Sequence, residues 1–403
     1  MNLFREQVPY IHRPPKYSPW IKPALNAACS YLLKNKFKIT EVHIQGAGTL
    51  ASLVKEGHSV LVAPNHADHA DPSLLITAAR KAGVTFHFMA AREGFEKGSF
   101  QRFFLQKSGA FSVNREGGDI GAIKTAIRIL QEAQFPLVIF PEGEIYHHHE
   151  TLDELNDGVA SILLRAGSKL REGKQSYVVP TGIRIHHSEE VQGSFSERLD
   201  RLEQSITWKP RPDLDPVQRI YRLGSALLSI KEEEFLGHSN QGSLVDRIQG
   251  LQHRLLADIE ALHQLPSETS PIPARIKTLR GKIRSELTNK EAPLDEDREE
   301  ELYDQLDRIF IAQQFYSYPG RYLKENPTHD RIAETIFKLE EDVLQAEQYY
   351  GPRTADIIFD KPIDISSFLE ERSLNFKTGV PAITQTIREK VQKLLRSHNG
   401  NTR

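Results

Sequence analysis

The first half of the chain alternates short apolar runs with segments of helical periodicity. Unbroken apolar runs are typical of strands that are buried on both faces of a mostly parallel sheet. We predict three such strands, at Ser59–Ala63, Leu137–Phe140 and Tyr177–Ile185. Helical patterns separate them, at Ser73–Ala82, Asp119–Leu130 and Gly158–Ala166. This alternation predicts an α/β fold with a mostly parallel central sheet flanked by helices.

The pattern changes near residue 200. Apolar residues then keep helical spacing over long stretches, at Leu244, Ile248, Leu251, Leu255, Ile259 and Leu262, and again at Ile332, Ile336, Leu339, Val343 and Leu344. Strand-like residues return at Ala355–Asp364, and a last helix follows with Ile383, Ile387, Val391 and Leu394 on one face. A lone strand cannot satisfy its own backbone hydrogen bonds. We therefore expect this strand to rejoin the first sheet.

These patterns divide the chain of 403 residues into four parts. Residues 1–40 form a basic amphipathic segment, residues 41–200 the first part of the α/β domain, residues 201–350 an all-helical insertion, and residues 351–403 the last strand and helix of the α/β domain. An insertion of roughly 150 residues has the size of an ordinary domain.

Composition excludes several classes of protein. The 52 Lys and Arg nearly balance the 54 Asp and Glu, so we expect no nucleic-acid partner. A single cysteine, Cys29, excludes an intramolecular disulfide and a cysteine-based zinc site. No apolar stretch reaches the ~20 residues of a spanning helix, and the opening Met1–Glu6 lacks the pattern of a signal peptide. We expect a cytoplasmic protein that is soluble or lies on the inner face of a membrane.

The beginning of the chain carries excess positive charge. Residues 1–50 hold seven Lys or Arg and only two acids. This segment also has the composition of an amphipathic anchor on an anionic bilayer, with the apolar residues Trp20, Ile21, Leu25, Tyr31, Leu32 and Leu33. The alternative is a short helix that packs on its own domain with its lysines in water.

Histidine and aspartate residues are concentrated where the first predicted strand ends, in Pro64–Pro72. Ligands of open α/β sheets bind at the carboxyl ends of strands, so His66 stands where a catalytic base belongs. Pro72 favours a helix that begins only after Asp71, which leaves the loop free to fold His66 onto the Asp71 carboxylate. Such a pair fixes the imidazole tautomer and stabilises the imidazolium. The alternative is a helix-capping Asp71 beside an ordinary loop histidine.

A metal site is the second alternative for this stretch. His66, Asp68, His69 and Asp71 are dense in ligand atoms, but their order matches no standard site. Three further histidines, His147, His148 and His149, are adjacent in sequence and cannot all converge on one ion in regular structure. We therefore expect no metal.

Several blocks, in a fixed order, resemble the glycerolipid acyltransferase family, of the bacterial 1-acylglycerol-3-phosphate acyltransferase type. The blocks are Asn65-His66 with Asp71, Gly109–Arg115, Phe140-Pro-Glu-Gly143, Val179–Ile183 and Ile358–Ile363. They cover roughly residues 40–190 and 354–396. The first supplies the His-x4-Asp motif of that family.

The resemblance implies an O-acyltransferase with His66 and Asp71 as catalytic residues. His66 would deprotonate an acceptor hydroxyl and Asp71 would orient it, with an acyl thioester of CoA or acyl carrier protein as donor and no further cofactor. Asn65, Arg115, Glu142 and Gly143 would bind substrate, with Arg115 suited to a phosphate. The plainer alternatives are a surface ion pair for Arg115 and a structural turn at Glu142-Gly143.

The chain departs from the family where Glu144-Ile145 replaces the usual Thr-Arg. A second positive charge is missing, so the acceptor is either a lysolipid such as 1-acylglycerol-3-phosphate or another lipid alcohol. Either acceptor resides in a bilayer, which makes a membrane surface a partner. The competing function is a catalytically silent lipid- or protein-binding protein that acts through its helical module.

Overall fold

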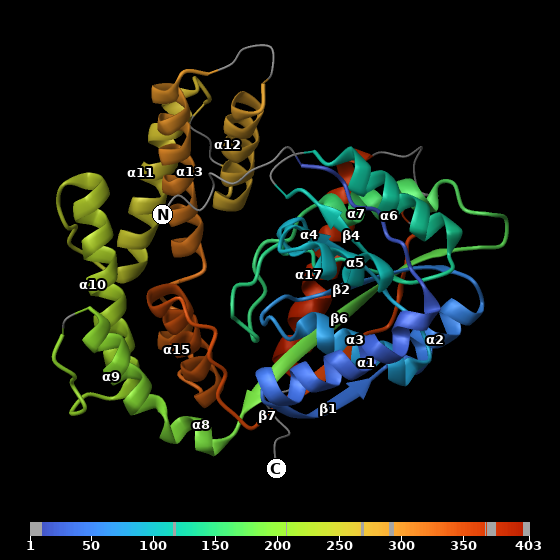
Figure 1. Ribbon diagram of the computed structural model, residues 1–403, viewed down its shortest axis with the longest axis horizontal. Helices are drawn as coiled ribbons and strands as arrows, with labels where there is room; N and C mark the ends of the chain where they lie inside the picture. The colour runs from blue at the N-terminus through green and yellow to red at the C-terminus, as the bar shows by residue number, and fades with distance from the viewer. Residues whose placement is uncertain are drawn as a thin grey trace. The chain divides into compact units, whose positions relative to one another are not determined.

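The structure is a computed structural model that describes residues 10–115, 118–206, 208–266, 270–289, 294–366, 368 and 376–397. The chain forms two compact units (Figure 1). The α/β unit comprises His12–Asn114, Asp119–Gln192 and Gln348–Arg403, and the helical unit comprises Met1–Ile11, Arg115–Gly118 and Gly193–Glu347. The α/β unit is therefore discontinuous in sequence, and the long stretch of the helical unit begins eight residues before the 201 that we expected.

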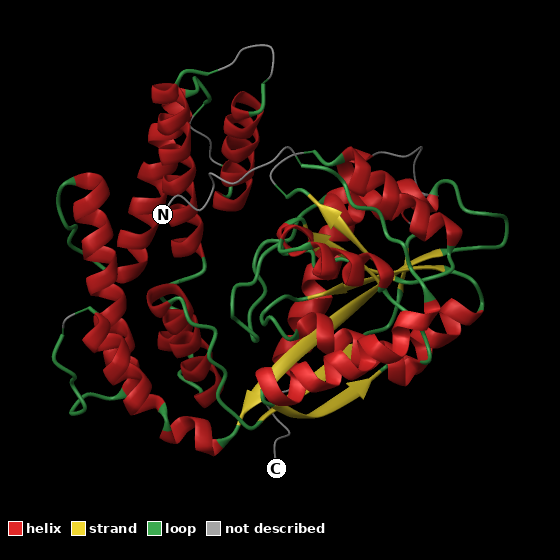
Figure 2. Cartoon of the chain, viewed as in Figure 1, coloured by secondary structure: helices red, strands yellow, loops and turns green. Residues whose placement is uncertain are grey.

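The α/β unit contains one mixed, mostly parallel sheet (Figure 2). Its strands follow the order β1-β7-β6-β2-β5-β3-β4, and β8 pairs with β6 beside this path. Only the β6–β7 and β6–β8 pairings are antiparallel. The strands are β1 Ile39–Gln45, β2 Ser59–Pro64, β3 His87–Ala91, β4 Ala110–Val113, β5 Leu137–Val138, β6 Ser176–His187, β7 Arg353–Phe359 and β8 Ile363–Asp364.

The strand that follows the helical stretch rejoins the first sheet, as predicted. In β7, Ile357 pairs with Ile44 of β1 on one side and with Ile183 of β6 on the other. The predicted strand Leu137–Phe140 is too long, because β5 ends at Val138. The chain turns away there, and Phe140 belongs to the loop that approaches His66.

Helices cover both faces of this sheet, which confirms the predicted fold class. One face carries α2 and α3, and the other carries α6, α7 and α17. The helices are α2 Ala47–Lys55, α3 Asp71–Ala82, α4 Glu93–Glu96, α5 Ser99–Lys107, α6 Ile120–Glu132, α7 Gly158–Gly167, α8 Glu189–Gly193 and α17 Phe376–Ser397. As predicted, the Asp119 side chain caps α6 and Gly83 ends α3 in a left-handed conformation.

Residues 12–38 pack within the α/β unit. Arg13 lies along the outer side of the edge strand β4, where its backbone carbonyl accepts a hydrogen bond from the Ser112 N–H at 3.0 Å. This contact protects an edge that would otherwise expose unpaired backbone groups. The segment continues as η1 Pro19–Ile21, α1 Lys22–Tyr31 and the π-helical turn η2 Leu32–Lys36. Ile21, Cys29 and Leu33 are buried, so α1 is part of the folded unit.

The helical unit contains a bundle whose apolar core is drawn from α10 to α13. Its helices are α9 Phe195–Ser205, α10 Pro216–Leu236, α11 Leu244–Leu262, α12 Ile272–Leu287, α13 Glu296–Tyr316, α14 Tyr322–Glu325 and α15 His329–Leu344. In α11 the predicted apolar face is buried at Ile248, Leu251, Leu255 and Ile259. Leu262 ends that helix and is 56% exposed. None of the helices in the described part of the chain combines the length and the apolarity that a bilayer crossing needs.

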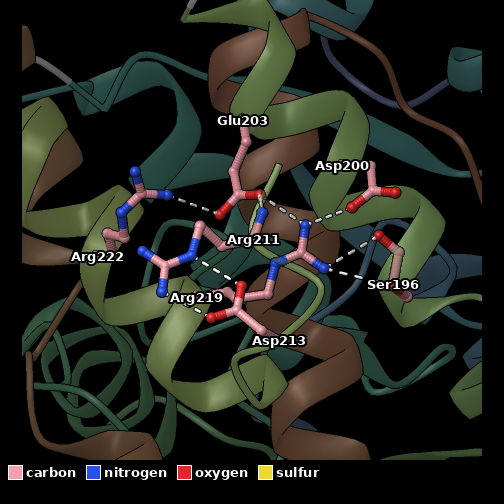
Figure 3. A network of polar contacts seen from close by, with 7 residues as sticks. All are labelled: Ser196, Asp200, Glu203, Arg211, Asp213, Arg219 and Arg222. Carbon is pink, nitrogen blue, oxygen red and sulfur yellow. Dashed lines mark hydrogen bonds and ion pairs between the residues drawn. The ribbon is translucent and has the colours of Figure 1, made fainter. Parts of the chain in front are cut away.

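A buried ion network joins α9 to α10 (Figure 3). The fully buried Glu203 carboxylate accepts hydrogen bonds from Arg219 at 2.7 Å and from Arg222 at 3.2 Å. Burial raises the pKa of Glu203, but the hydrogen bonds from Arg219 and the Arg211 N–H, with the arginine charges, outweigh it and leave the pKa lowered. Glu203 therefore stabilises the unit as a carboxylate, and this contribution is lost as the pH falls below the ordinary pKa of glutamate.

We predict that Glu203→Gln destabilises the helical unit by about 3 kcal/mol at neutral pH, because it removes the buried negative charge that pairs with Arg219 and Arg222. Urea denaturation followed by Trp208 fluorescence, in a Trp20→Phe background, measures the loss. The control is Asp213→Asn, which breaks the exposed Arg211–Asp213 pair and is expected to cost less than about 0.5 kcal/mol. Equal losses in the two variants would contradict the prediction.

Candidate active site

The loop between β2 and α3 brings His66 and Asp71 together. The His66 Nδ1 atom lies 2.9 Å from the Asp71 Oδ2 atom, with the Asp71 side chain fully buried and the His66 side chain 16% exposed. A carboxylate only accepts hydrogen bonds, so Nδ1 holds the imidazole proton and Nε2 keeps its lone pair. This is the arrangement of a base and its orienting carboxylate.

Asp71 fixes the backbone of the loop as well as the histidine ring. Its Oδ2 atom also accepts hydrogen bonds from the backbone N–H groups of Ala67 at 2.9 Å and Asp68 at 3.0 Å. These donors precede the helix, whereas a capping side chain binds N–H groups inside the first turn. The α3 helix already begins at Asp71, one residue earlier than predicted, with Ala70 in the cap position. Asp71 therefore holds the His66 loop and does not cap α3.

A buried ion pair ties the same loop to the strand that follows the helical unit. The Asp68 carboxylate accepts a hydrogen bond from Arg353 at 2.8 Å, and both side chains are 4% exposed. Arg353 also donates two hydrogen bonds to the Phe37 carbonyl, at 2.9 and 2.7 Å. Burial raises the pKa of Asp68, but the Arg353 and His149 charges and the hydrogen bonds from the Ala70 N–H and Arg353 hold that pKa well below its ordinary value. Sequence analysis missed Arg353 because its partner is 285 residues away.

The Asn65 side chain bonds the neighbouring strand β6, and its predicted role in substrate binding stays a prediction. Its side chain is 1% exposed. The amide oxygen accepts a hydrogen bond from the Ile183 N–H at 2.7 Å, and the amide nitrogen donates one to the Ile183 carbonyl at 2.9 Å. The Asn65 side chain thus adds two hydrogen bonds to β6 just beyond the end of β2. These bonds fix the point at which the His66 loop leaves the sheet.

Glu142 supports His66 from a second loop. Its Oε1 atom accepts a hydrogen bond from the His66 backbone N–H at 2.7 Å, and its Oε2 atom accepts one from the Asp153 N–H at 3.1 Å. Both oxygens therefore accept hydrogen bonds from backbone N–H groups, and the role of Glu142 in acceptor binding stays a prediction. The ring of Phe140 stacks on the His66 ring with centroids 3.9 Å apart, a contact that sequence analysis did not foresee.

Gly143 and Arg115 complete the predicted set of site residues. Gly143 has a φ of +79°, and a Cβ atom there would lie 3.0 Å from the Asn156 amide nitrogen, so this tight turn requires glycine. Arg115 is not part of the His66 cluster. It comes two residues after β4, is half-buried and is grouped with the helical unit.

The three adjacent histidines are buried. His147, His148 and His149 are at most 9% exposed, and the His147 ring lies 5.6 Å from that of His69. Among the described residues of the α/β unit, no three His, Cys, Asp or Glu side chains bring ligand atoms close enough to share one metal ion.

We predict that Arg353→Met destabilises the α/β unit by about 3–5 kcal/mol, because it leaves the buried Asp68 charge without a partner. Hydrogen–deuterium exchange of β2 peptides reports this loss for the α/β unit alone. Arg128→Met, which breaks the exposed pair with Glu132, is the matched control and is expected to cost less than about 0.5 kcal/mol. The double variant Asp68→Asn/Arg353→Met is expected to cost less than the sum of its single changes, and strict additivity would argue against the pair.

We expect the free energy of unfolding to depend on pH through Glu142. Burial, and next the Asp153 charge, raise the pKa of Glu142 from 4.5 to about 8. Between these values the unfolded chain loses the Glu142 proton while the folded chain keeps it, so a rise in pH favours unfolding by up to ~1.4 kcal/mol per pH unit. Relative to Glu142→Gln, the wild type is expected to lose stability as the pH rises from 5 to 8. Urea denaturation followed by circular dichroism tests this. A difference that does not change with pH would contradict it, and the exposed Glu132→Gln is the control.

Comparison with known proteins agrees with this geometry. Residues 42–184 match the family model described as Acyltransferase. This match confirms the resemblance to glycerolipid acyltransferases over the first part of the α/β unit, which contains His66, Asp71 and Glu142. It supports acyl transfer as the general activity of the chain. A comparison with curated proteins gave no match.

Proposed function

We propose that the α/β unit transfers a fatty acyl group from a thioester to a hydroxyl group of a glycerolipid-type acceptor. The observation that carries this proposal is the 2.9 Å contact between His66 Nδ1 and the buried Asp71 carboxylate, at the carboxyl end of β2. It occurs inside the stretch that matches the acyltransferase family model. The family match supports the reaction class, and the geometry supports the assignment of the base.

The proposed reaction begins with the lone pair of His66 Nε2, which takes the proton of the acceptor hydroxyl as its oxygen attacks the thioester carbonyl. The carbonyl electron pair moves onto oxygen, and then returns as the carbon–sulfur bond breaks. The thiolate leaves with the bonding pair and receives the proton from the His66 imidazolium. Asp71 stays a carboxylate throughout and stabilises the imidazolium through Nδ1–H.

The neighbours of His66 support this role for the ring. Glu142 and Asp71 hold the loop backbone at His66, Ala67 and Asp68, and Phe140 covers one face of the imidazole. The ring therefore loses little further freedom when the acceptor binds, which is how a fixed base accelerates proton transfer.

The donor and acceptor follow from the family resemblance. We propose CoA or acyl carrier protein as the thiol carrier, and a lysolipid or other lipid alcohol as acceptor. Arg115 is our candidate for contact with a phosphate on the acceptor, because guanidinium binds phosphate with paired hydrogen bonds. Because the acceptor is a lipid, we propose that the protein works at the surface of a membrane.

We predict that His66→Ala lowers acyl transfer by about 10⁴-fold, and that Asp71→Asn causes a loss of similar size, because each removes one half of the base and its orienting partner. Release of thiol from acyl-CoA in the presence of a panel of lysolipids measures turnover. His43→Ala is the matched control, since His43 also contacts a carboxylate, that of Asp356, but lies on the edge strand β1 with its side chain 58% exposed.

Folding of each variant is checked by circular dichroism before turnover is compared. Near-normal turnover of a folded His66→Ala protein would disprove the proposed base. Wild-type protein that binds lysolipid but releases no thiol from acyl-CoA with any acceptor would disprove the proposed reaction.

A further inference from the structure

The α5 helix exposes two phenylalanine side chains and buries a glutamine side chain. Phe100 is 80% exposed and Phe103 is 47% exposed, whereas Gln106 is 7% exposed. Residues three apart on a helix are neighbours on its surface, so the two phenyl groups form one exposed apolar strip. This strip needs an explanation, because the same helix turns an amide inward.

The buried side of α5 is occupied by the chain that precedes η1. Gln106 donates a side-chain hydrogen bond to the Pro14 carbonyl at 2.7 Å, and its own carbonyl accepts one from the Lys16 N–H at 2.8 Å. The Ser18 N–H bonds the Lys107 carbonyl in the same way. The buried Gln106 amide thus fastens the early segment to α5, whereas Phe100 and Phe103 stay exposed.

A third aromatic side chain belongs to the same surface. Trp20 of η1 is 61% exposed, and its ring lies 6.4 Å from that of Phe103. Lys107 places its ammonium group 5.9 Å from the centroid of the Phe103 ring. We call Trp20, Phe100 and Phe103 the aromatic patch.

The segments that form the aromatic patch carry only positive charge. Residues 10–38 contain six Lys or Arg, and residues 97–107 contain three, with no Asp or Glu in either segment. Lys22 follows Trp20 closely, and Arg102 and Lys107 flank Phe103. The acids nearest in sequence are Glu96 before the second segment and Glu41 after the first, and Glu96 lies 3.6 Å from Arg92.

We propose that the aromatic patch docks the α/β unit on an anionic lipid bilayer. The two phenyl groups enter the acyl region, Trp20 lies at the level of the headgroups, and the surrounding cations face the lipid phosphates. This inference rests on the proposed function, in which the acceptor is a lipid. Charge complementarity favours a bilayer over a second copy of the chain, because two such cationic surfaces repel each other.

The docking surface differs from the one expected from the sequence, which was the whole basic segment 1–40. Residues 12–18 are hydrogen-bonded to α5 and β4. The elements that follow, η1, α1 and η2, bury Ile21, Cys29 and Leu33 respectively. A deletion of residues 1–38 would therefore disrupt the α/β unit and test folding more than docking. Point substitutions in the patch avoid this problem.

The test compares full-length protein carrying Phe100→Ser/Phe103→Ser with the wild type. Each is mixed with vesicles of phosphatidylcholine alone or with added phosphatidylglycerol, and the bound fraction is measured by flotation. The matched control is Ile230→Ser/Leu262→Ser, which removes two exposed apolar side chains, 54% and 56% exposed, from the helical unit. Circular dichroism confirms folding, and the single variant Phe100→Ser replaces the double variant should the latter not fold.

We expect the wild type to bind anionic vesicles at low salt and to release them as salt is added. The double variant is expected to bind at least about tenfold more weakly, with the control unchanged. Lys107→Gln is expected to weaken binding roughly fivefold at low salt and not at high salt. Undiminished binding of the double variant, equal binding to neutral and anionic vesicles, or concentration-dependent dimerisation through the patch would each overturn the proposal.

A second measurement separates this inference from the proposed function. Turnover with a short-chain lysolipid that is dissolved as monomers needs no docking, so the double variant is expected to keep it. His66→Ala is expected to lose turnover and keep vesicle binding. Vesicle binding without turnover in the wild type would therefore refute only the proposed acyl transfer. Turnover without vesicle binding would refute only the proposed docking by the aromatic patch.

Discussion

One carboxylate oxygen organises the candidate active site. Oδ2 of the buried Asp71 accepts the ring N–H of His66 and two backbone N–H groups of the same loop. A buried charge is tolerated only where such donors surround it, so the loop and the carboxylate stabilise each other. Three further contacts hold the same loop. Asn65 bonds Ile183 where the loop begins, Glu142 bonds the His66 N–H, and Arg353 bonds the Asp68 carboxylate. The histidine is thereby held in one tautomer and one orientation before any substrate arrives.

The fold was predictable where local pattern and burial agree. The run at Ser59–Ala63 is buried at every residue because β2 lies inside the sheet under helices on both faces, and that is what an unbroken apolar run indicates. The long strand β6 extends two residues beyond the predicted Ile185. The path of the chain before β1 was not predictable, because its contacts with β4 and α5 use backbone groups and leave no periodic signal.

The site was predictable in its residue types and only partly in their contacts. Spacing identified His66 and Asp71, since a proline at the start of a helix and a histidine after a strand are local signals. The partners of Asn65 and Glu142 are backbone groups of Ile183, His66 and Asp153. Such partners are set by tertiary placement, which is why a motif match alone suggested substrate contacts for residues that support the loop.

The place of β7 in the sheet determines when the site is completed during synthesis. The edge strand β1 pairs with β7 alone among the described strands, and Arg353 at the start of β7 neutralises Asp68, which was made 285 residues earlier. At a translation rate of about 5–20 residues per second, Arg353 is synthesised roughly 15 to 60 seconds after Asp68. A ribosome-bound chain that stops within the helical unit therefore carries the motif and lacks its organised form. Such a nascent chain gains the Asp68–Arg353 pair only after β7 has been synthesised.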